Sequence, residues 1–221
     1  MDRYTTDEEQ FEALKTWWKE NGKAVIAGVI FGLIGLTGWR YWQGYVKTQT
    51  EQASAAYQRL LAQVADHKQE TAAQGAKRII ERFEKSPYAV FSALMLAKLY
   101  VEGNEPAKAK EQLQWVLDHS SPTEIKWVAR LRLARLLLAE GQPDQAWSLV
   151  SEMEREQQAA TLPSYYELKG DVLIAQGKPE EARNAYLQAL ALSGSAGSPP
   201  SLLQMKLDDL GEVSTAPGQA P

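Results

Sequence analysis

The chain has 221 residues, of which 44% are hydrophobic and 24% charged, enough to bury the core of one domain with length to spare. Its net charge of −4 argues against nucleic acid as a partner, because nucleic-acid binding needs a basic face. The absence of cysteine and the presence of two histidines, His67 and His119, exclude disulfides, thiolate zinc sites and His-rich metal sites, and argue against most acid–base enzymes.

The first predicted element is an apolar helix close to the N-terminus. Ala24–Trp39 are sixteen uncharged residues in a row, and the next three residues extend the stretch to nineteen. A helix of that length measures about 28 Å, close to the roughly 30 Å hydrocarbon layer of a bilayer. Lys23 and Arg40 can extend to the head groups. Aromatic residues typical of membrane interfaces stand on both sides: Trp17, Trp18, Trp39, Tyr41 and Trp42. We predict a transmembrane helix at 23–43.

A signal peptide and a buried soluble helix are the two alternatives to a transmembrane helix at this stretch. A cleaved signal peptide would need a shorter leader than Met1–Lys23, which carries six acidic residues, and a small-residue cleavage site, which does not follow. A buried helix of a soluble domain would show periodic polar positions. Lys15, Lys19 and Lys23 lie close on the N-terminal side of the uncharged stretch, and Arg40 and Lys47 on its C-terminal side. Three basic residues against two predict a cytoplasmic segment at 1–22. The rest of the chain would then lie outside the cytoplasm.

Small residues form one stripe on the predicted transmembrane helix. Gly28, Gly32 and Gly35 follow Ala24 at spacings of four, four and three. Such a stripe lets a second transmembrane helix approach closely, so these glycines are candidates for a packing face. Glycine is also common in membrane helices that make no such contact.

Prolines and glycines divide the remaining chain into helices. Eight of the ten prolines stand at Pro87, Pro106, Pro122, Pro143, Pro163, Pro179, Pro199 and Pro200. Because proline breaks a helix interior but suits its first turn, each interval predicts one helix of about four turns. Gly103, Gly141 and Gly177 each precede a proline by two or three residues, a pattern typical of tight turns between antiparallel helices.

These helix pairs repeat. Small residues recur at spacings of 37 and 36 in the first helix of each pair and again in the second: Ala97, Ala134 and Gly170, then Ala109, Ala146 and Ala182. Paired helices approach closely only where side chains are small. The pattern resembles the tetratricopeptide repeat, and a non-repeating helical bundle is the alternative. The sequence therefore predicts an all-α fold, in which one N-terminal transmembrane helix is followed by a tetratricopeptide-like solenoid of helical hairpins at 44–210.

Further segments complete the predicted domain. Gln49–Asp66 and Glu70–Glu84 carry apolar stripes and predict a helix pair in front of the repeats. Gly194–Pro200 is a spacer, and Ser201–Leu210 reads as a short helix that caps the end of the array. Gly211–Pro221 is expected to be a disordered tail.

One predicted helix is basic and could recruit a partner. Its four basic residues form two pairs of helical neighbours: Lys126 with Arg130, and Arg132 with Arg135. Tryptophans lie in the same region: Trp115, Trp127 and Trp147. An acidic peptide could bind here, although a solubilising surface accounts for the same charges. We find no phosphate loop and no catalytic motif, so we predict a binding module rather than an enzyme, without a cofactor.

Three segments resemble the YfgM family, the ancillary subunits of the bacterial SecYEG translocon. They are ENGKAVIAGVIFGLIGLTGWRYWQ at Glu20–Gln43, LRLAR at Leu131–Arg135 and QMK at Gln204–Lys206. The likeness covers nearly the whole chain up to the last predicted helix. The first segment is fairly specific, whereas helical repeats occur in many unrelated proteins.

The resemblance implies a single-pass protein of the bacterial inner membrane with a periplasmic tetratricopeptide-like domain. It implies association with the SecYEG translocon and with a membrane-anchored periplasmic chaperone of the PpiD type. The implied role is to pass exported polypeptides to periplasmic chaperones, with no catalytic residues. A tetratricopeptide scaffold for another bacterial envelope assembly is the alternative function.

Overall fold

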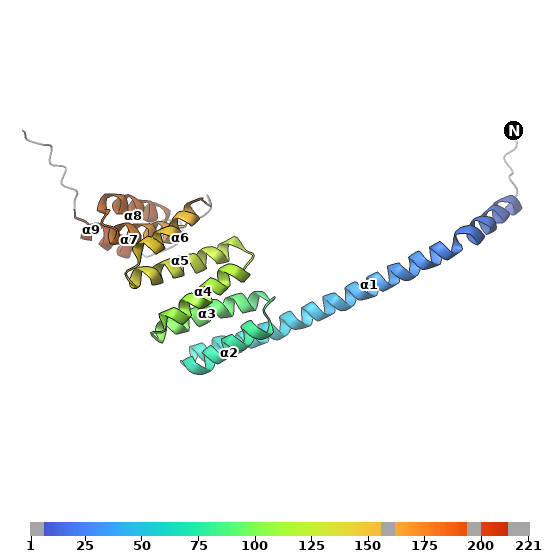
Figure 1. The fold of residues 1–221 in the computed structure, drawn as a ribbon, viewed down its shortest axis with the longest axis horizontal. Helices are drawn as coiled ribbons and strands as arrows, with labels where there is room; N and C mark the ends of the chain where they lie inside the picture. Colours follow the sequence, from blue (N-terminus) through green and yellow to red (C-terminus); the bar gives the residue numbers. More distant parts are fainter. Residues whose placement is uncertain (1–6, 156–161, 194–199, 212–221) are drawn as a thin grey trace, which may run out of the picture. The chain divides into compact units, whose positions relative to one another are not determined.

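The computed structural model describes residues 7–155, 162–193 and 200–211, which form helices and no strand (Figure 1). The chain divides into two compact units, Met1–Gln52 and Ala53–Pro221. The predicted all-α fold, with an apolar N-terminal helix ahead of paired helices, is therefore confirmed for the described residues. The predicted spacer at Gly194–Pro200 and the predicted tail at Gly211–Pro221 lie almost entirely outside them.

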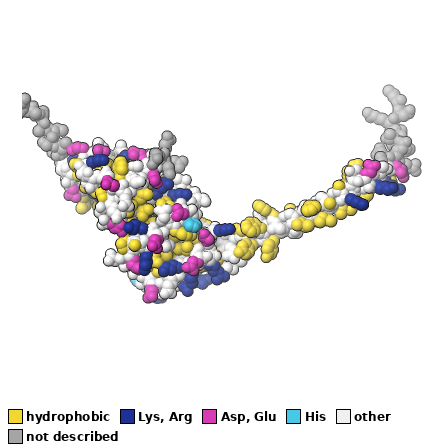
Figure 2. Space-filling view, viewed as in Figure 1, with side chains coloured by type: hydrophobic (Ala, Val, Ile, Leu, Met, Phe, Trp, Pro, Cys, Tyr) yellow, Lys and Arg dark blue, Asp and Glu magenta, His cyan; other side chains and the backbone are white. Residues whose placement is uncertain are grey.

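The first unit consists of most of helix α1, which spans Asp7–Ala65. Among the described helices, α1 is the one long and apolar enough to cross a membrane. Large apolar side chains from Ile26 to Val46 are exposed along it, and Figure 2 shows them as a run of hydrophobic atoms. The Thr37 hydroxyl donates to the carbonyl of Leu33 at 2.7 Å, so this polar group is satisfied within the helix.

Helix α1 is longer than the predicted transmembrane segment. The span at 23–43 and the first helix of the leading pair belong to one uninterrupted helix. The sequence has no proline before Pro87. The hydroxyls of Thr48 and Thr50 donate back to the carbonyls of Gly44 and Val46, at 3.0 and 2.9 Å. Nothing in this stretch therefore ends the helix.

The second unit continues with helices that follow one another in chain order (Figure 1). They are α2 (Gln69–Arg82), α3 (Pro87–Glu102), α4 (Pro106–His119), α5 (Thr123–Ala139), α6 (Pro143–Arg155), α7 (Pro163–Ala175), α8 (Pro179–Ser193) and α9 (Pro200–Asp209). Six of them begin at a proline, as predicted from the fixed φ of that residue. At the start of α3, the Ser86 hydroxyl accepts a hydrogen bond from the Tyr88 amide at 3.2 Å and caps the helix.

The turns inside the helix pairs share one geometry. Each has a residue with positive φ two positions before the next helix: His67 (56°), Asn104 (56°), Gly141 (73°) and Gly177 (74°). In each turn the following amide donates to the carbonyl five residues earlier, as Gln142 does to Leu137 at 2.9 Å. In the first predicted repeat this residue is Asn104, whereas Gly103 has a φ of −81°. The match at His67 makes the leading helix pair a fourth unit of the same kind.

The predicted small positions are all buried between paired helices: Ala97, Ala109, Ala134, Ala146, Gly170 and Ala182. At Gly170 in α7 an added Cβ would overlap the ring of Tyr186 in α8, so the two helices are too close there for a larger side chain. In the leading pair, α1 with α2, the large residue stands on the first helix and the small residue on the second. Leu60 stands at the small position of the first helix, and Ala76 replaces the large residue of the second, both at most 1% exposed.

Helix α9 covers the end of the array, as predicted. Its Leu203 and Leu207 are buried in a cluster with residues of α7 and α8. The Lys206 ammonium donates to Glu167 Oε1 at 2.9 Å and to Asp171 Oδ1 at 2.7 Å, and the Tyr186 hydroxyl donates to the same Asp171 oxygen at 2.8 Å. Since Glu167 is buried, this polar network holds α9 in one register on α7 and α8.

The contact between Gly170 and Tyr186 predicts a test of the packing. Gly170→Ala should lower the free energy of unfolding by about 1–3 kcal/mol, because the new methyl group overlaps the Tyr186 ring. The same change should cost much less in a Tyr186→Leu background, since Ala97 already packs beside Leu113 at the equivalent place. Urea denaturation followed by circular dichroism measures both. Gly44→Ala, whose Cβ would meet nothing within 4 Å, is the control. Equal costs in the two backgrounds would contradict the packing argument.

The network around α9 predicts a loss of stability in alkali. Burial lowers the pKa of Lys206, but its hydrogen bonds to Asp171 and Glu167 outweigh burial and raise that pKa above 10.5. The stabilisation that the Lys206 ammonium provides is therefore complete below pH 10.5. It is lost as the pH rises through the raised pKa of Lys206. Burial, and next the hydrogen bond to Asp171, raises the pKa of Tyr186 above 10.0, so ionisation in the unfolded chain favours unfolding.

From these groups we expect a free energy of unfolding that is flat between about pH 7 and 9 and falls above about pH 10. Tyr186→Phe should make the alkaline fall shallower, because the phenol no longer titrates. Urea titrations at a series of pH values measure the slope. An identical slope in the variant would show that the Tyr186 hydroxyl does not contribute.

Candidate protein-interaction surface

A groove runs between α3 and α5, the first helices of two successive pairs; we call it the first-helix groove. It has a volume of about 470 Å³. Its lining residues are Ala97, Lys98, Val101, Glu102, Leu113, Arg132, Arg135, Leu136 and Ala139. Most of these residues are apolar and the rest are charged, so the groove combines an apolar floor with a charged rim.

The charged residues of the first-helix groove differ in the ion pairs and hydrogen bonds that they make. Lys98 pairs with Glu102 on α3 at 3.5 Å. The Arg132 guanidinium donates to the carbonyl of Leu94 at 3.2 Å, which ties α5 to α3. Burial, and next the charge of Arg135, lowers the pKa of Arg132. Arg135 is exposed and makes no ion pair among the described residues.

The structure does not bring all four predicted basic residues together. Arg132 and Arg135 line the first-helix groove, whereas Arg130 faces α6, where its Nε lies 4.0 Å from Glu152 Oε2. Lys126, one turn before Arg130, is half-buried and lines none of the described grooves. Residues two apart on a helix point about 200° away from each other, which places the two pairs on different faces of α5. A role in partner binding stays a prediction for all four.

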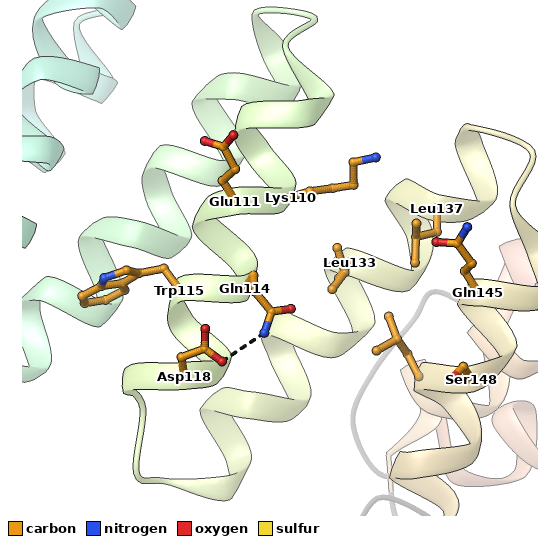
Figure 3. A pocket seen from close by; sticks show the side chains of 10 residues that line it. Lys110, Glu111, Gln114, Trp115, Asp118, Leu133, Leu137, Gln145 and Ser148 are labelled. Atoms are coloured by element: carbon orange, nitrogen blue, oxygen red, sulfur yellow. Dashed lines mark hydrogen bonds between the residues drawn. The ribbon is translucent and has the colours of Figure 1, made fainter.

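A second groove lies between α4 and α6, over α5; we call it the second-helix groove (Figure 3). It has a volume of about 780 Å³. Leu133, Leu137 and Leu149 supply apolar atoms, and Trp115 stands on the α4 side. On the same helix the Gln114 amide donates to Asp118 Oδ1 at 3.0 Å. The rim is polar around an apolar centre, which suits the burial of apolar side chains from a partner.

The three tryptophans of this region differ in burial. Trp127 is 6% exposed and belongs to the main core cluster. Trp147 is half-buried, with the Lys178 ammonium 5.7 Å from the centre of its ring. Trp115 is half-buried, stacks on His119 with ring centres 4.2 Å apart, and lines the second-helix groove. No tryptophan lines the first-helix groove with the two arginines, so Trp115 marks a different surface.

Both grooves have apolar floors and polar or charged rims, which are the features of a surface that takes up polypeptide segments. Apolar floors accept side chains of a bound segment, while charged rims select its register. Among the residues that the structure describes, no group of three or more His, Asp or Glu side chains could hold a metal ion. Sequence reasoning missed the second-helix groove, because its lining comes from three helices whose facing positions show no common motif.

The sequence is similar to one family of known proteins over nearly its whole length. The profile of a family described as a tetratricopeptide repeat-like domain matches residues 15–212. The ancillary SecYEG translocon subunit of Escherichia coli (strain K12) is 34% identical, over 95% of this chain and 99% of that protein. The protein of the same name from Haemophilus influenzae is 35% identical, over 94% and 99%. That from Neisseria gonorrhoeae is 28% identical, over 95% and 100%.

Among solved structures, pilF of Pseudomonas aeruginosa has a similar fold. The TM-score is 0.58 at 20% sequence identity, over 73% of this chain and 68% of that one. This likeness shows the fold alone.

The two groove arginines should respond differently to the same substitution. Arg132→Gln removes the hydrogen bond to the Leu94 carbonyl and should lower the free energy of unfolding by about 1 kcal/mol. Arg135→Gln removes a charge that bonds to nothing described and should change it by less than about 0.5 kcal/mol. Urea denaturation measures both values. A larger loss for Arg135→Gln would contradict the assignment of Arg132 as the structural residue.

Proposed function

Because this chain belongs to the family of ancillary SecYEG translocon subunits, we propose that it is a membrane-anchored, non-enzymatic adaptor at the SecYEG translocon. Similarity over nearly the full length of both chains is the observation that carries this proposal, since it includes the apolar helix as well as the repeats. The family name describes a subunit that accompanies a channel, which is a non-catalytic kind of protein.

In this proposal α1 crosses the bacterial inner membrane once. The exposed apolar side chains from Ile26 to Val46 face lipid, and the hydroxyl of Thr37 is already satisfied by its own helix. The N-terminus lies in the cytoplasm and the helix pairs lie in the periplasm, in agreement with the basic residues on either side of the span.

The proposed mechanism is local concentration. A domain tethered beside the exit of the channel meets emerging polypeptides at an effective concentration of about a millimolar, so weak contacts suffice. The first-helix groove, with Arg132 and Arg135, offers an apolar floor and a cationic rim for exported polypeptides. Lys126 and Arg130, on the other side of α5, are a second candidate contact. A periplasmic chaperone of the PpiD type is the proposed recipient.

The contact with the translocon is proposed to involve the glycine stripe of α1. Gly28, Gly32 and Gly35 fall on one face of the helix, and a Cβ added at any of them would meet nothing within 4 Å. That face is open to close approach by another transmembrane helix.

Removal of Met1–Trp42 tests the tether. We expect the remaining chain to keep its helical circular dichroism and to lose co-purification with SecYEG, because no apolar span remains to hold it beside the channel. Affinity purification from solubilised membranes, read by mass spectrometry, compares the full chain with the truncated one.

Undiminished recovery of the channel with the truncated chain would contradict tethering. If the full chain instead recovers mainly proteins of another envelope assembly, the alternative of a scaffold outside the secretion system would replace the proposal.

A further inference from the structure

A third groove lies within the leading helix pair, between the last turns of α1 and α2; we call it the arginine groove. It has a volume of about 590 Å³. Arg59 from α1 and Arg78 and Arg82 from α2 line it, and apolar atoms come from Ile79 and Phe83. Figure 2 shows Lys and Arg side chains gathered in the region of α2.

The three arginines have no carboxylate to neutralise them. None of Arg59, Arg78 and Arg82 makes an ion pair or a hydrogen bond among the described residues, and all three are exposed. Arg82 lies against the ring of Phe83, with its Cζ 5.5 Å from the ring centre. Glu81 lines the same groove without pairing with any of them. In a chain of net charge −4, three unpaired guanidinium groups around one groove are a concentrated excess of positive charge.

Other basic residues of this unit are neutralised or placed on different surfaces. Lys68 bonds to Asp66 at 2.9 Å, and Lys110 bonds to Glu140 at 2.7 Å. Lys77, on the same helix as two of the arginines, lies over the ring of Tyr100 at 5.8 Å and outside the groove. Charges that serve only solubility can stand anywhere on the surface. The gathering of three arginines around one groove therefore favours a binding role.

We propose that the arginine groove binds an extended acidic segment of a partner polypeptide. Guanidinium groups form paired, charge-assisted hydrogen bonds with carboxylates, and those bonds are stronger than bonds between neutral groups. The apolar atoms of Ile79 and Phe83 provide a floor for a side chain between the carboxylates. Recognition of acidic motifs by clustered arginines is a known mode of peptide binding.

The spacing of the arginines specifies the spacing of the acidic residues. Arg78 and Arg82 are one helical turn apart, a rise of about 6 Å. Alternate residues of an extended chain are about 6.6 Å apart and point to the same side. The groove therefore fits acidic residues that alternate with other residues, and Arg59 adds a third guanidinium to the same lining from α1. This proposal does not depend on the complex that the chain joins, because it concerns a groove that the proposed function does not use.

The test uses the full chain in nanodiscs of phosphatidylcholine, which has no net charge. A short fluorescent peptide with Asp at alternate positions is titrated, and its polarisation is measured. We expect saturable binding that weakens about tenfold or more in Arg78→Gln/Arg82→Gln, since each charge-assisted contact is worth more than a neutral one. The matched control, Lys77→Gln/Lys85→Gln, removes the same charge from outside the groove and should bind within about twofold of the unmodified chain.

The possible outcomes distinguish binding of an acidic peptide in the groove from attraction by the net charge of the protein. A peptide with Asn in place of Asp should not bind, and a peptide with its aspartates three residues apart should bind more weakly. Equal loss in the arginine and lysine variants would overturn the proposal, because net charge alone would then account for binding. No peptide binding, together with arginine-dependent association with vesicles containing phosphatidylglycerol, would overturn it in favour of a lipid head group. Circular dichroism and thermal melting confirm that each variant is folded.

Discussion

Close approach of paired helices, where a small residue of one helix meets a large residue of the other, is the constraint on which the second unit depends. It is seen at Gly170, where the ring of Tyr186 occupies the space of a Cβ. The equivalent pairs place Ala97 near Leu113 and Ala134 near Val150 in one core cluster. Since each pair buries only part of its apolar surface alone, neighbouring pairs must stack, and the last must be covered. Helix α9 provides that cover and is fixed by the bonds from Lys206.

The same constraint determines where the chain can bind other molecules. Buried residues at the small positions fix the helices at a close spacing, and side chains on the outer turns line the hollows between helices that are not partners in a pair. The first-helix and second-helix grooves are such hollows, whereas the arginine groove lies inside one pair and is lined only by residues of α1 and α2 and by Phe83, directly after α2. Charged residues line all three grooves, but only some of them make ion pairs or hydrogen bonds with other residues of the chain.

Much of this fold could be predicted from sequence, because proline and the recurring small residues act locally. The leading pair escaped recognition as a repeat, since Leu60 and Ala76 exchange the usual sizes and His67 takes the place of glycine in the turn. The continuity of α1 was missed because its apolar and amphipathic stretches were assigned separately. The grooves could be predicted least. Helical spacing alone separates Arg130 from Arg132, but their partners, Glu152 of α6 and the Leu94 carbonyl of α3, depend on how the pairs stack.

We propose that α1 holds these helix pairs beside the exit of the secretion channel, where they contact polypeptides in transit. Photo-crosslinking from Val101, an exposed residue of the first-helix groove, tests this most directly when it is done in intact membranes during export. We expect crosslinks to channel subunits and to exported chains, and their loss when export is blocked before the exported chain emerges. Crosslinks confined to cytoplasmic proteins, or an unchanged pattern when export is blocked, would contradict it.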